Sequence, residues 1–402
     1  MTKVMAVNAG SSTLKWQLFQ MPEEQKIAGG MIDRLGKENA HFIVEYGDGQ
    51  KIDQEEPITT HELAAAKILT RLKELGIVEH LEEITGVGHR VVAGGELFKS
   101  STRITQQVLD QIKELKEYAP LHNAIEAYYI GVFQELLPHA TQVAVFDTSF
   151  YSTLEPEDYL YSIDLDYYKR FRARKYGAHG TSHRYVSSRA AELMGKPAED
   201  LKLITLHLGS GASISAIDGG KAVDTSMGFT PLAGITMGTR CGDIDPSLIP
   251  YLMQQLGITD INEFIDILNK KSGLLGLSGL SADMRDLEDT ETTNERSALA
   301  LSVFVNRVVK YVGAYVARLG GVDGIVFTAG SGENGIDLRQ RIGDRLSAFG
   351  VKIDPERNHV RGKERLISTD DSKVTAFIIP TNEELMIARD TYALHVKDHK
   401  LN

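Results

Sequence analysis

The chain is poor in cysteine and in long apolar runs. Its 402 residues include one cysteine, Cys241, which excludes an intramolecular disulfide and a cysteine-rich zinc site. Apolar runs such as residues 143–146 and 325–327 have the length of strands, well short of the ~18–20 residues of a membrane helix. The N-terminal MTKVMAVNAG leads straight into a strand-like segment without the features of a signal peptide. We therefore expect a cytoplasmic protein with no membrane partner.

An excess of positive charge is also absent. The formal net charge is −11, and such an acidic chain does not attract nucleic acid or anionic membranes. An anionic small molecule would need a local site, built from a few Arg and Lys side chains and from backbone N–H groups. The search for functional residues therefore turns to glycine-rich turns and to isolated cations near strand ends.

Strand-like and helix-like segments alternate along the chain, with no Pro-rich or low-complexity linker between them. Helical periodicity covers residues 61–76, 181–195 and 298–319, and glycines at the three ends are typical stop signals. Thr181 or Ser182 is the expected N-cap of the second helix. The segments GVGHRVV and QVAVFDTSF are typical of buried strands. This alternation predicts an α/β protein with largely buried sheets, of a length that allows two or three domains.

Two segments half a chain apart resemble each other. Residues 4–15 (VMAVNAGSSTLK) and 204–215 (ITLHLGSGASIS) each read as a strand, a turn of small residues and a second strand. A third turn of this kind, IVFTAGSGENG at 325–335, leads into a helix. The three could be unrelated tight turns, since Gly and Ser are common there. The alternative is a duplicated domain whose hairpin turns face each other across a cleft and bind phosphate through backbone N–H groups.

The common nucleotide-binding signatures do not account for these turns. No Walker A motif is present, because Gly195-Lys196 is followed by Pro197 and lacks the upstream glycine. Residues 330–335 form a GxGxxG pattern, with Asp354 about 20 residues further on, as in dinucleotide-binding folds. Too little chain follows for a full doubly wound sheet, so the pattern favours a helix N-terminus facing a nucleotide phosphate rather than a dehydrogenase.

Several charged residues stand where surface roles explain them poorly. Arg90 lies among apolar residues in VGHRVVAGG, and Arg240 lies in the Gly- and Thr-rich MGTRCGDIDP, so both are expected to face substrate. Asp147 ends a strand, where it could be functional or a turn acceptor. Glu383 and Glu384 follow the strand FIIP and could instead be acids of a first helical turn.

The histidines alone are less informative. His179 and His183 have the i,i+4 spacing of a metal pair, but Gly180 and the cap-like Thr-Ser indicate that His179 lies outside the helix. No third ligand accompanies them, which argues against zinc. For His89 and His122, a core or loop position explains the residue equally well.

Together, ten motifs resemble the acetate kinase family, in the family's order and over essentially the whole chain. They are NAGSSTLK, GVGHRVVAGG, APLHN, VAVFDTSF, RKYGAHGTSH, HLGSGASISAIDGGK, DTSMGFTPLAGITMGTRCGDIDPSLIP, KKSGLLGLSGLSADMRD, FTAGSGEN and IPTNEELMIARD. The resemblance implies the actin-like ATPase fold, an α/β fold of duplicated ribonuclease-H-like domains with an interdomain cleft. The N-terminal domain would span residues 1–150 and be completed by a C-terminal helix at 385–402. The C-terminal domain, 151–384, would carry the nucleotide.

The resemblance also implies a role for each matching residue. Arg90 would bind the substrate carboxylate, Asp147 would position or deprotonate it, and His179 and Arg240 would stabilise the phosphoryl group in flight. Asn8 and Glu383 would organise Mg²⁺, for which Mn²⁺ may substitute. The acyl group would be bound by Val92, Leu121, His122 and Pro231. ATP or ADP would be bound by Lys15, His207, Leu208, Gly209, Ser210, Gly211, Asp283, Met284, Arg285, Gly330, Ser331, Gly332, Glu333 and Asn334. A homodimer is expected from the family alone.

The sequence departs from the family pattern at four places that carry no catalytic charge. Ala178 stands where many members have Phe, Ser210 and Ser331 replace Asn and Ile in the two glycine-rich turns, and Ala124 replaces Pro. These changes bear on acyl-chain preference and nucleotide affinity. The predicted reaction is reversible, Mg-assisted, in-line phosphoryl transfer from ATP to acetate. A propionate or other short-chain acyl kinase is the alternative. A non-enzymatic, actin- or Hsp70-like nucleotide switch would not need Arg90 and Arg240 beside a small apolar pocket.

Overall fold

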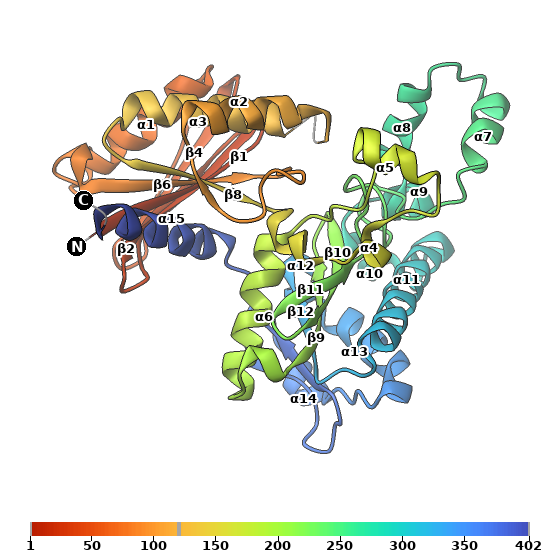
Figure 1. Cartoon of the computed structure of the whole chain (residues 1–402). Helices are drawn as coiled ribbons and strands as arrows, with labels where there is room; N and C mark the ends of the chain where they lie inside the picture. Colours follow the sequence, from red (N-terminus) through yellow and green to blue (C-terminus); the bar gives the residue numbers. More distant parts are fainter. Residues whose placement is uncertain (1, 119–121, 401–402) are drawn as a thin grey trace. The chain divides into compact units, whose positions relative to one another are not determined.

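The computed structural model describes residues 2–118 and 122–400, so the predicted acyl-pocket residue Leu121 lies outside the described part. Internal contacts divide the chain into two compact units (Figure 1). Unit 1 comprises Met1–Ser152 and Asn382–Asn402, and unit 2 comprises Thr153–Thr381.

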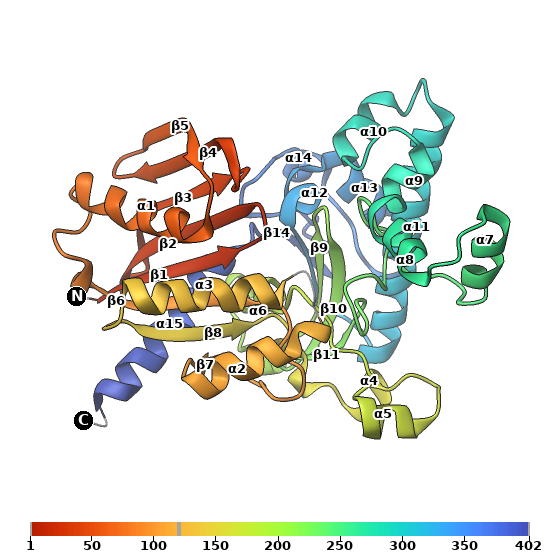
Figure 2. The same ribbon diagram turned by 90° about the horizontal axis from the view of Figure 1, so that it is seen from above.

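Unit 1 is built on a mixed sheet in the order β5-β4-β3-β2-β1-β6-β8-β7 (Figure 2). The central pairs β1–β6 and β6–β8 are parallel, whereas β1 to β5 form an antiparallel meander. The strands span β1 (Thr2–Ala9), β2 (Thr13–Met21), β3 (Gln25–Asp33), β4 (Lys37–Tyr46), β5 (Gln50–Ile58), β6 (Ile84–Val91), β7 (Thr102–Arg103) and β8 (Thr141–Phe146).

Helices cover both faces of this sheet. In Figure 1, α1 (His61–Glu74), α2 (Gln106–Glu114) and α3 (Asn123–Leu136) lie on one face and α15 (Glu383–Lys400) on the other. The glycines of GVGHR make room for α15: a Cβ at Gly88 would lie 2.2 Å from Oγ1 of Thr391 and 2.4 Å from Ile387. This close packing holds the first turn of α15, which begins at Glu383, beside the strand that carries Arg90.

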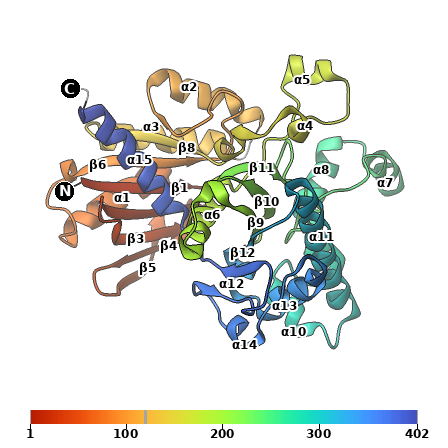
Figure 3. The ribbon, with the colours of Figure 1, turned by 60° about the horizontal axis from the view of Figure 1, so that its bottom comes forward.

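Unit 2 has a six-stranded mixed sheet in the order β11-β10-β9-β12-β14-β13. The strands span β9 (Lys202–Leu208), β10 (Ala212–Asp218), β11 (Lys221–Thr225), β12 (Gly324–Thr328), β13 (Arg365–Leu366) and β14 (Thr375–Ile378). Figure 3 shows α6 (Gly180–Met194) on one face and α11 (Glu295–Leu319) with α13 (Ile336–Arg345) on the other. The remaining helices are α4 (Pro156–Tyr159), α5 (Leu165–Phe171), α7 (Leu248–Leu256), α8 (Ile261–Lys270), α9 (Gly273–Ser278), α10 (Met284–Thr290), α12 (Ala329–Asn334) and α14 (Pro355–Asn358).

The two sheets repeat one topology, which confirms the duplication predicted from the sequence. The strands β3-β2-β1-β6-β8 and β11-β10-β9-β12-β14 each consist of an antiparallel meander followed by two parallel strands. The matching segments 4–15 and 204–215 form the hairpins β1–β2 and β9–β10.

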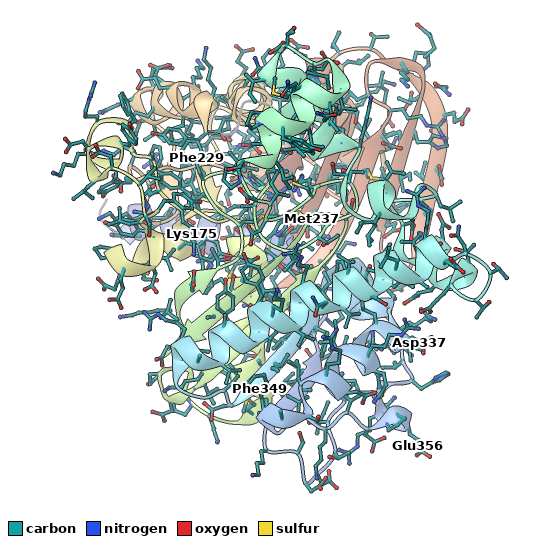
Figure 4. All side chains as sticks on the ribbon, turned by 90° about the vertical axis from the view of Figure 1, so that its right-hand side faces the viewer. Lys175, Phe229, Met237, Asp337, Phe349 and Glu356 are labelled. Atoms are coloured by element: carbon teal, nitrogen blue, oxygen red, sulfur yellow. The ribbon has the colours of Figure 1, made fainter. Side chains whose placement is uncertain are left out.

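The long helix α11 is the main core helix of unit 2. Within the described residues it is the one helix long and apolar enough to cross a membrane, with a mean hydropathy of 1.3 in its most apolar window. Apolar runs alone did not reveal this, because polar residues interrupt the helix. Its buried stripe, which includes Leu301, Phe304 and Val308, belongs to the core of unit 2. Figure 4 shows α11 lying across this unit, with Phe349 labelled next to it.

The predicted helices are confirmed, but the predicted N-cap of α6 is wrong. The cap is His179, with a left-handed φ of 58°, rather than Thr181 or Ser182. The Ser182 hydroxyl instead lies 2.8 Å from Nδ1 of His207 and 2.7 Å from the hydroxyl of Thr381. Its role in joining α6 to neighbouring segments competes with capping, and this could not be read from local sequence.

Candidate active site

Unit 1 brings Arg90 and Asp147 together at the ends of two parallel strands. Nη2 of Arg90, near the end of β6, donates to Oδ2 of Asp147 at 2.7 Å, and Nε lies 3.2 Å from both carboxylate oxygens. Asp147 directly follows β8 and is fully buried. This two-pronged geometry fixes the guanidinium plane and leaves Nη1 near the Oδ1 of Asn8, 3.3 Å away.

Negative charge gathers around this one arginine. Burial disfavours the charged guanidinium, but Asp147 and Glu383 outweigh that effect and raise the pKa of Arg90 above its ordinary value. Burial also raises the pKa of Glu383 to about 7, against the attraction of Arg90. A carboxylate held in this state binds a cation readily, because a positive charge relieves both desolvation and repulsion. Lys15, on β2, is exposed and lies opposite Asn8 in the strand register.

The loop after Arg90 is held by buried side chains of α3 and of the segment after β8. The N–H of Val92 donates to Glu126 at 3.0 Å, and Ala93 both donates to and accepts from the Asn123 amide, at 3.1 and 2.9 Å. The next N–H, of Gly94, donates to the Thr148 hydroxyl at 2.9 Å. Sequence reasoning found Val92 but missed Asn123 and Glu126, which fix its backbone. His122, predicted to bind substrate, is the half-buried N-cap of α3.

Unit 2 places the side chains of Arg240 and His179 beside the turn between β9 and β10. A Cβ added to Gly211 would lie 3.2 Å from Nη1 of Arg240 and 3.5 Å from Nε2 of His179. Both side chains therefore reach the same small residue of the glycine-rich turn, although 60 residues separate them. The glycine leaves room between them for a ligand atom that any other residue would fill.

Arg240 is a cation without a matching anion. Among the described residues its guanidinium contacts only the Pro231 carbonyl, at 3.4 Å, and the sulfur of Met237, at 3.8 Å, and no carboxylate lies within ion-pair distance. Burial lowers its pKa from the ordinary value, although an arginine remains charged at neutral pH. Figure 4 labels Met237 of this loop. A partly buried charge left unpaired by its own chain is typical of an anion-binding site.

A cavity of about 530 Å³ lies next to this turn, inside unit 2. Eight of the predicted nucleotide-binding residues line it: Gly209, Ser210, Asp283, Met284, Arg285, Gly330, Ser331 and Asn334. It also includes residues that sequence reasoning missed, among them Gly238, Glu288, Phe304 and Arg361. Gly238 is closely packed, since a Cβ there would lie 3.2–3.3 Å from the Ala282 carbonyl and from Ser210, so a larger residue would require these neighbours to shift.

The other predicted nucleotide residues support the cavity wall or lie elsewhere. Leu208 is fully buried, and the His207 ring stacks on His179 with centroids 4.1 Å apart. Glu333 accepts the N–H groups of Ala329 and Thr381, at 2.9 and 3.1 Å. Gly332 is buried, with its carbonyl bonded to Arg339 at 3.0 Å. Lys15 belongs to unit 1.

Comparison with known proteins places the whole chain in one group. A sequence model described as the acetokinase family matches residues 3–389. The protein named acetate kinase 1 of Latilactobacillus sakei subsp. sakei (strain 23K) is 66% identical over 394 residues, covering 98% of this chain and 100% of that protein.

Solved structures agree with the sequence comparison. A crystal structure of Porphyromonas gingivalis acetate kinase matches with a TM-score of 0.92 at 42% identity, over 98% of this chain and 100% of that chain. A propionate kinase from Francisella tularensis subsp. tularensis SCHU S4 matches with a TM-score of 0.91 at 37% identity, with the same coverage. These matches confirm the predicted duplicated actin-like ATPase fold.

Proposed function

The chain belongs to the acetokinase family and is a kinase that phosphorylates acetate with ATP. On this basis we propose how its two units divide the reaction. Unit 1 binds the acetate carboxylate through Arg90, and the apolar side chain of Val92 contacts the methyl group. Unit 2 binds ATP in the cavity beside residues 209–211 and 330–334. The split follows the chemistry of the residues: one guanidinium fixed by Asp147 for a carboxylate, and a glycine-rich turn with an unpaired cation for phosphate.

In this proposal, the protein aligns the reactants and neutralises charge. Acetate is already ionised at neutral pH, so its oxygen can attack the γ-phosphorus without a base. Asp147 therefore acts by orienting Arg90 and the bound acetate. Arg240 and His179 donate to the equatorial oxygens of the phosphoryl group in flight, where negative charge accumulates. Exclusion of water protects the acyl phosphate product from hydrolysis.

Asn8 and Glu383 are suited to bind a Mg²⁺ ion that is also bound to the nucleotide. Both offer oxygen ligands, which Mg²⁺ prefers. The raised pKa of Glu383, about 7, reflects a half-buried carboxyl group that a cation would stabilise in its ionised form. No cluster of three or more metal-binding side chains occurs in the described residues, which suits an ion that keeps waters and phosphate oxygens as its other ligands. When bound, the ion would neutralise phosphate charge, and Mn²⁺ offers the same chemistry.

The meeting of Arg240 and His179 at Gly211 is the observation that carries this proposal. The proposal predicts different kinetic defects for substitutions of Arg90 and Arg240. Arg90→Ala is expected to raise the KM for acetate by roughly 10–100-fold, as for the loss of a charged hydrogen bond. Arg240→Ala is expected to lower kcat by on the order of 10³-fold with little change in the KM for ATP. Steady-state kinetics on folded variants tests this, and an Arg240→Ala enzyme that keeps more than a tenth of wild-type kcat contradicts it.

We also propose a cytoplasmic homodimer. Large apolar side chains are exposed on unit 2, including Phe171 (58%), Tyr251 (57%) and Leu256 (60%). Contiguous exposed apolar surface commonly marks a protein–protein interface, and in this proposal the side chains on α5 and α7 contribute to one. Sedimentation equilibrium at micromolar concentration tests the assembly, and a monomer there would contradict it.

A further inference from the structure

A chain of buried polar groups leads from His179 into the interior of unit 2. Nδ1 of His179 lies 2.9 Å from the Ser213 hydroxyl, which in turn lies 2.8 Å from Nε2 of His183. Nδ1 of His183 lies 2.6 Å from the hydroxyl of Thr205. Ser213, His183 and Thr205 are fully buried. They come from β10, α6 and β9, so three elements converge behind one imidazole.

The number of available protons limits the directions in which these hydrogen bonds can point. Burial lowers the pKa of His183 well below its ordinary value, with the neighbouring His207 as a second cause, so His183 is neutral and carries one ring proton. Each hydroxyl can donate once. The Ser213 hydroxyl lies between two imidazole nitrogens and can donate to only one of them. If it accepted from both nitrogens, its own O–H would be buried without an acceptor, because His179 and His183 are its only side-chain partners among the described residues. The hydrogen bonds therefore all point outward to His179 or all point inward to Thr205.

Thr205 decides the direction. Among the residues that the structure describes, its side chain has a single hydrogen-bond partner, Nδ1 of His183. If the hydroxyl accepted from His183, its own O–H would be buried without an acceptor, which is costly. It therefore donates to Nδ1, and the single proton of His183 lies on Nε2 and is donated to Ser213. Ser213 then donates to Nδ1 of His179.

We propose that Ser213, His183 and Thr205 are positioning residues that hold His179 in the tautomer with its proton on Nε2. This nitrogen is the one beside Gly211, so the N–H is presented to the phosphoryl group; the inference rests on the proposed role of His179. Protonating Nδ1 would require both hydroxyls and the His183 tautomer to reverse. The left-handed φ of His179, 58°, is unfavourable for a residue with a side chain, and the ring's fixed partners help to offset it.

Kinetics with a matched control tests this arrangement. Ser213→Ala is expected to lower kcat by roughly 10–100-fold, the loss of a hydrogen bond that orients a catalytic group, while the KM values for ATP and acetate change little. Ser215→Ala removes a buried hydroxyl two residues along the same strand, where it pairs with Thr225 at 3.0 Å, and should keep kcat. Melting curves of both variants distinguish a loss of folding from a misoriented His179 ring, because only the first lowers the melting temperature strongly. Thr205→Val keeps the side-chain shape but removes the hydroxyl, so it interrupts the same series of hydrogen bonds at a second point. It is expected to lower kcat by less than Ser213→Ala.

A double-mutant cycle distinguishes positioning from general packing. In a His179→Ala background, Ser213→Ala should lower kcat no further, because the group that it orients is absent. A further drop of tenfold, or an unchanged kcat for Ser213→Ala alone, overturns the inference and leaves the proposed function intact. If His179→Ala itself retains nearly full kcat, the proposed role of His179 fails instead.

Histidine NMR gives a readout that does not depend on activity. In protein labelled with ¹⁵N-histidine and assigned with His→Gln variants, His179 and His183 should both show the pattern of a neutral ring protonated on Nε2. In Ser213→Ala, the His179 signal should shift toward a mixture of tautomers while His183 remains neutral. A wild-type His179 protonated on Nδ1 at neutral pH would overturn the assignment.

Discussion

At the scale of single residues, isolated charges were the most informative sequence signal. Arg90 and Arg240 could be predicted to face substrate because neither lies among the other charges of a solvated helix. The structure pairs Arg90 with Asp147, and it places no carboxylate beside Arg240 within residues 2–118 and 122–400. Ser213, Asn123 and Glu126 could not be predicted in this way, since their partners lie 30 to 34 residues away or on another element and small or ordinary polar residues carry no local signature.

Ala178 carries a prediction at this scale. It precedes His179, is buried, and belongs to the core of unit 2. Ala178→Phe introduces a ring that must displace its neighbours, which typically costs about 1–3 kcal/mol. We expect a lower melting temperature and less space for a longer acyl chain, so the ratio of kcat/KM for propionate to that for acetate should fall. An Ala178→Phe enzyme, active on acetate, with the wild-type ratio would show that this position does not influence chain length.

At the scale of elements, hydrophobic periodicity predicted the helices well. The helix predicted over 298–319 is α11, which begins one turn earlier because Asn294 caps it through the N–H groups of Arg296 and Ser297. The glycine-rich segment 329–334 is a short helix whose first residue, Ala329, has a left-handed φ of 63°. The pattern predicted a turn leading into a helix, but not the hydrogen bond that holds the strained residue, which the N–H of Ala329 donates to the Glu333 carboxylate of the same helix at 2.9 Å.

Arg339 holds the Gly332 carbonyl of this short helix and gives an element-scale prediction. It is fully buried and donates to the Gly332, Asn358 and Val360 carbonyls at 2.8–3.0 Å, which joins α12 to the segment after α14. Burial lowers its pKa to about 10, so it remains charged at neutral pH. Arg339→Met leaves these carbonyls unpaired, at about 1–3 kcal/mol each. The melting temperature should fall by several degrees.

Arg339→Met should affect ATP binding more than acetate binding. Gly330 and Asn334 flank the carbonyl that Arg339 holds and line the cavity, so the KM for ATP should rise while the KM for acetate changes little. Arg345→Met, an exposed change on the same helix, is the control. Equal effects on both KM values would indicate a general loss of structure.

At the scale of the whole molecule, the sequence predicted the duplication because two hairpins of similar sequence lie half a chain apart. The relative placement of the two units has no such signal in the sequence. If ATP binds to unit 2 and acetate to unit 1, as proposed, phosphoryl transfer requires the two ligands to meet. We therefore predict that a saturating, non-hydrolysable ATP analogue decreases the radius of gyration in small-angle scattering. An unchanged radius would argue against domain closure by nucleotide.

The most direct test of the account traps the product. Purified protein is incubated with acetate, ATP, Mg²⁺ and hydroxylamine, and acetyl hydroxamate is measured together with ADP. We predict that hydroxamate forms in step with ADP, that its formation requires all three of acetate, ATP and Mg²⁺, and that it falls by on the order of 10³-fold in the Arg240→Ala variant. Release of ADP without hydroxamate, or ATP binding with neither product, would contradict the assignment of this chain as an acetate-phosphorylating enzyme.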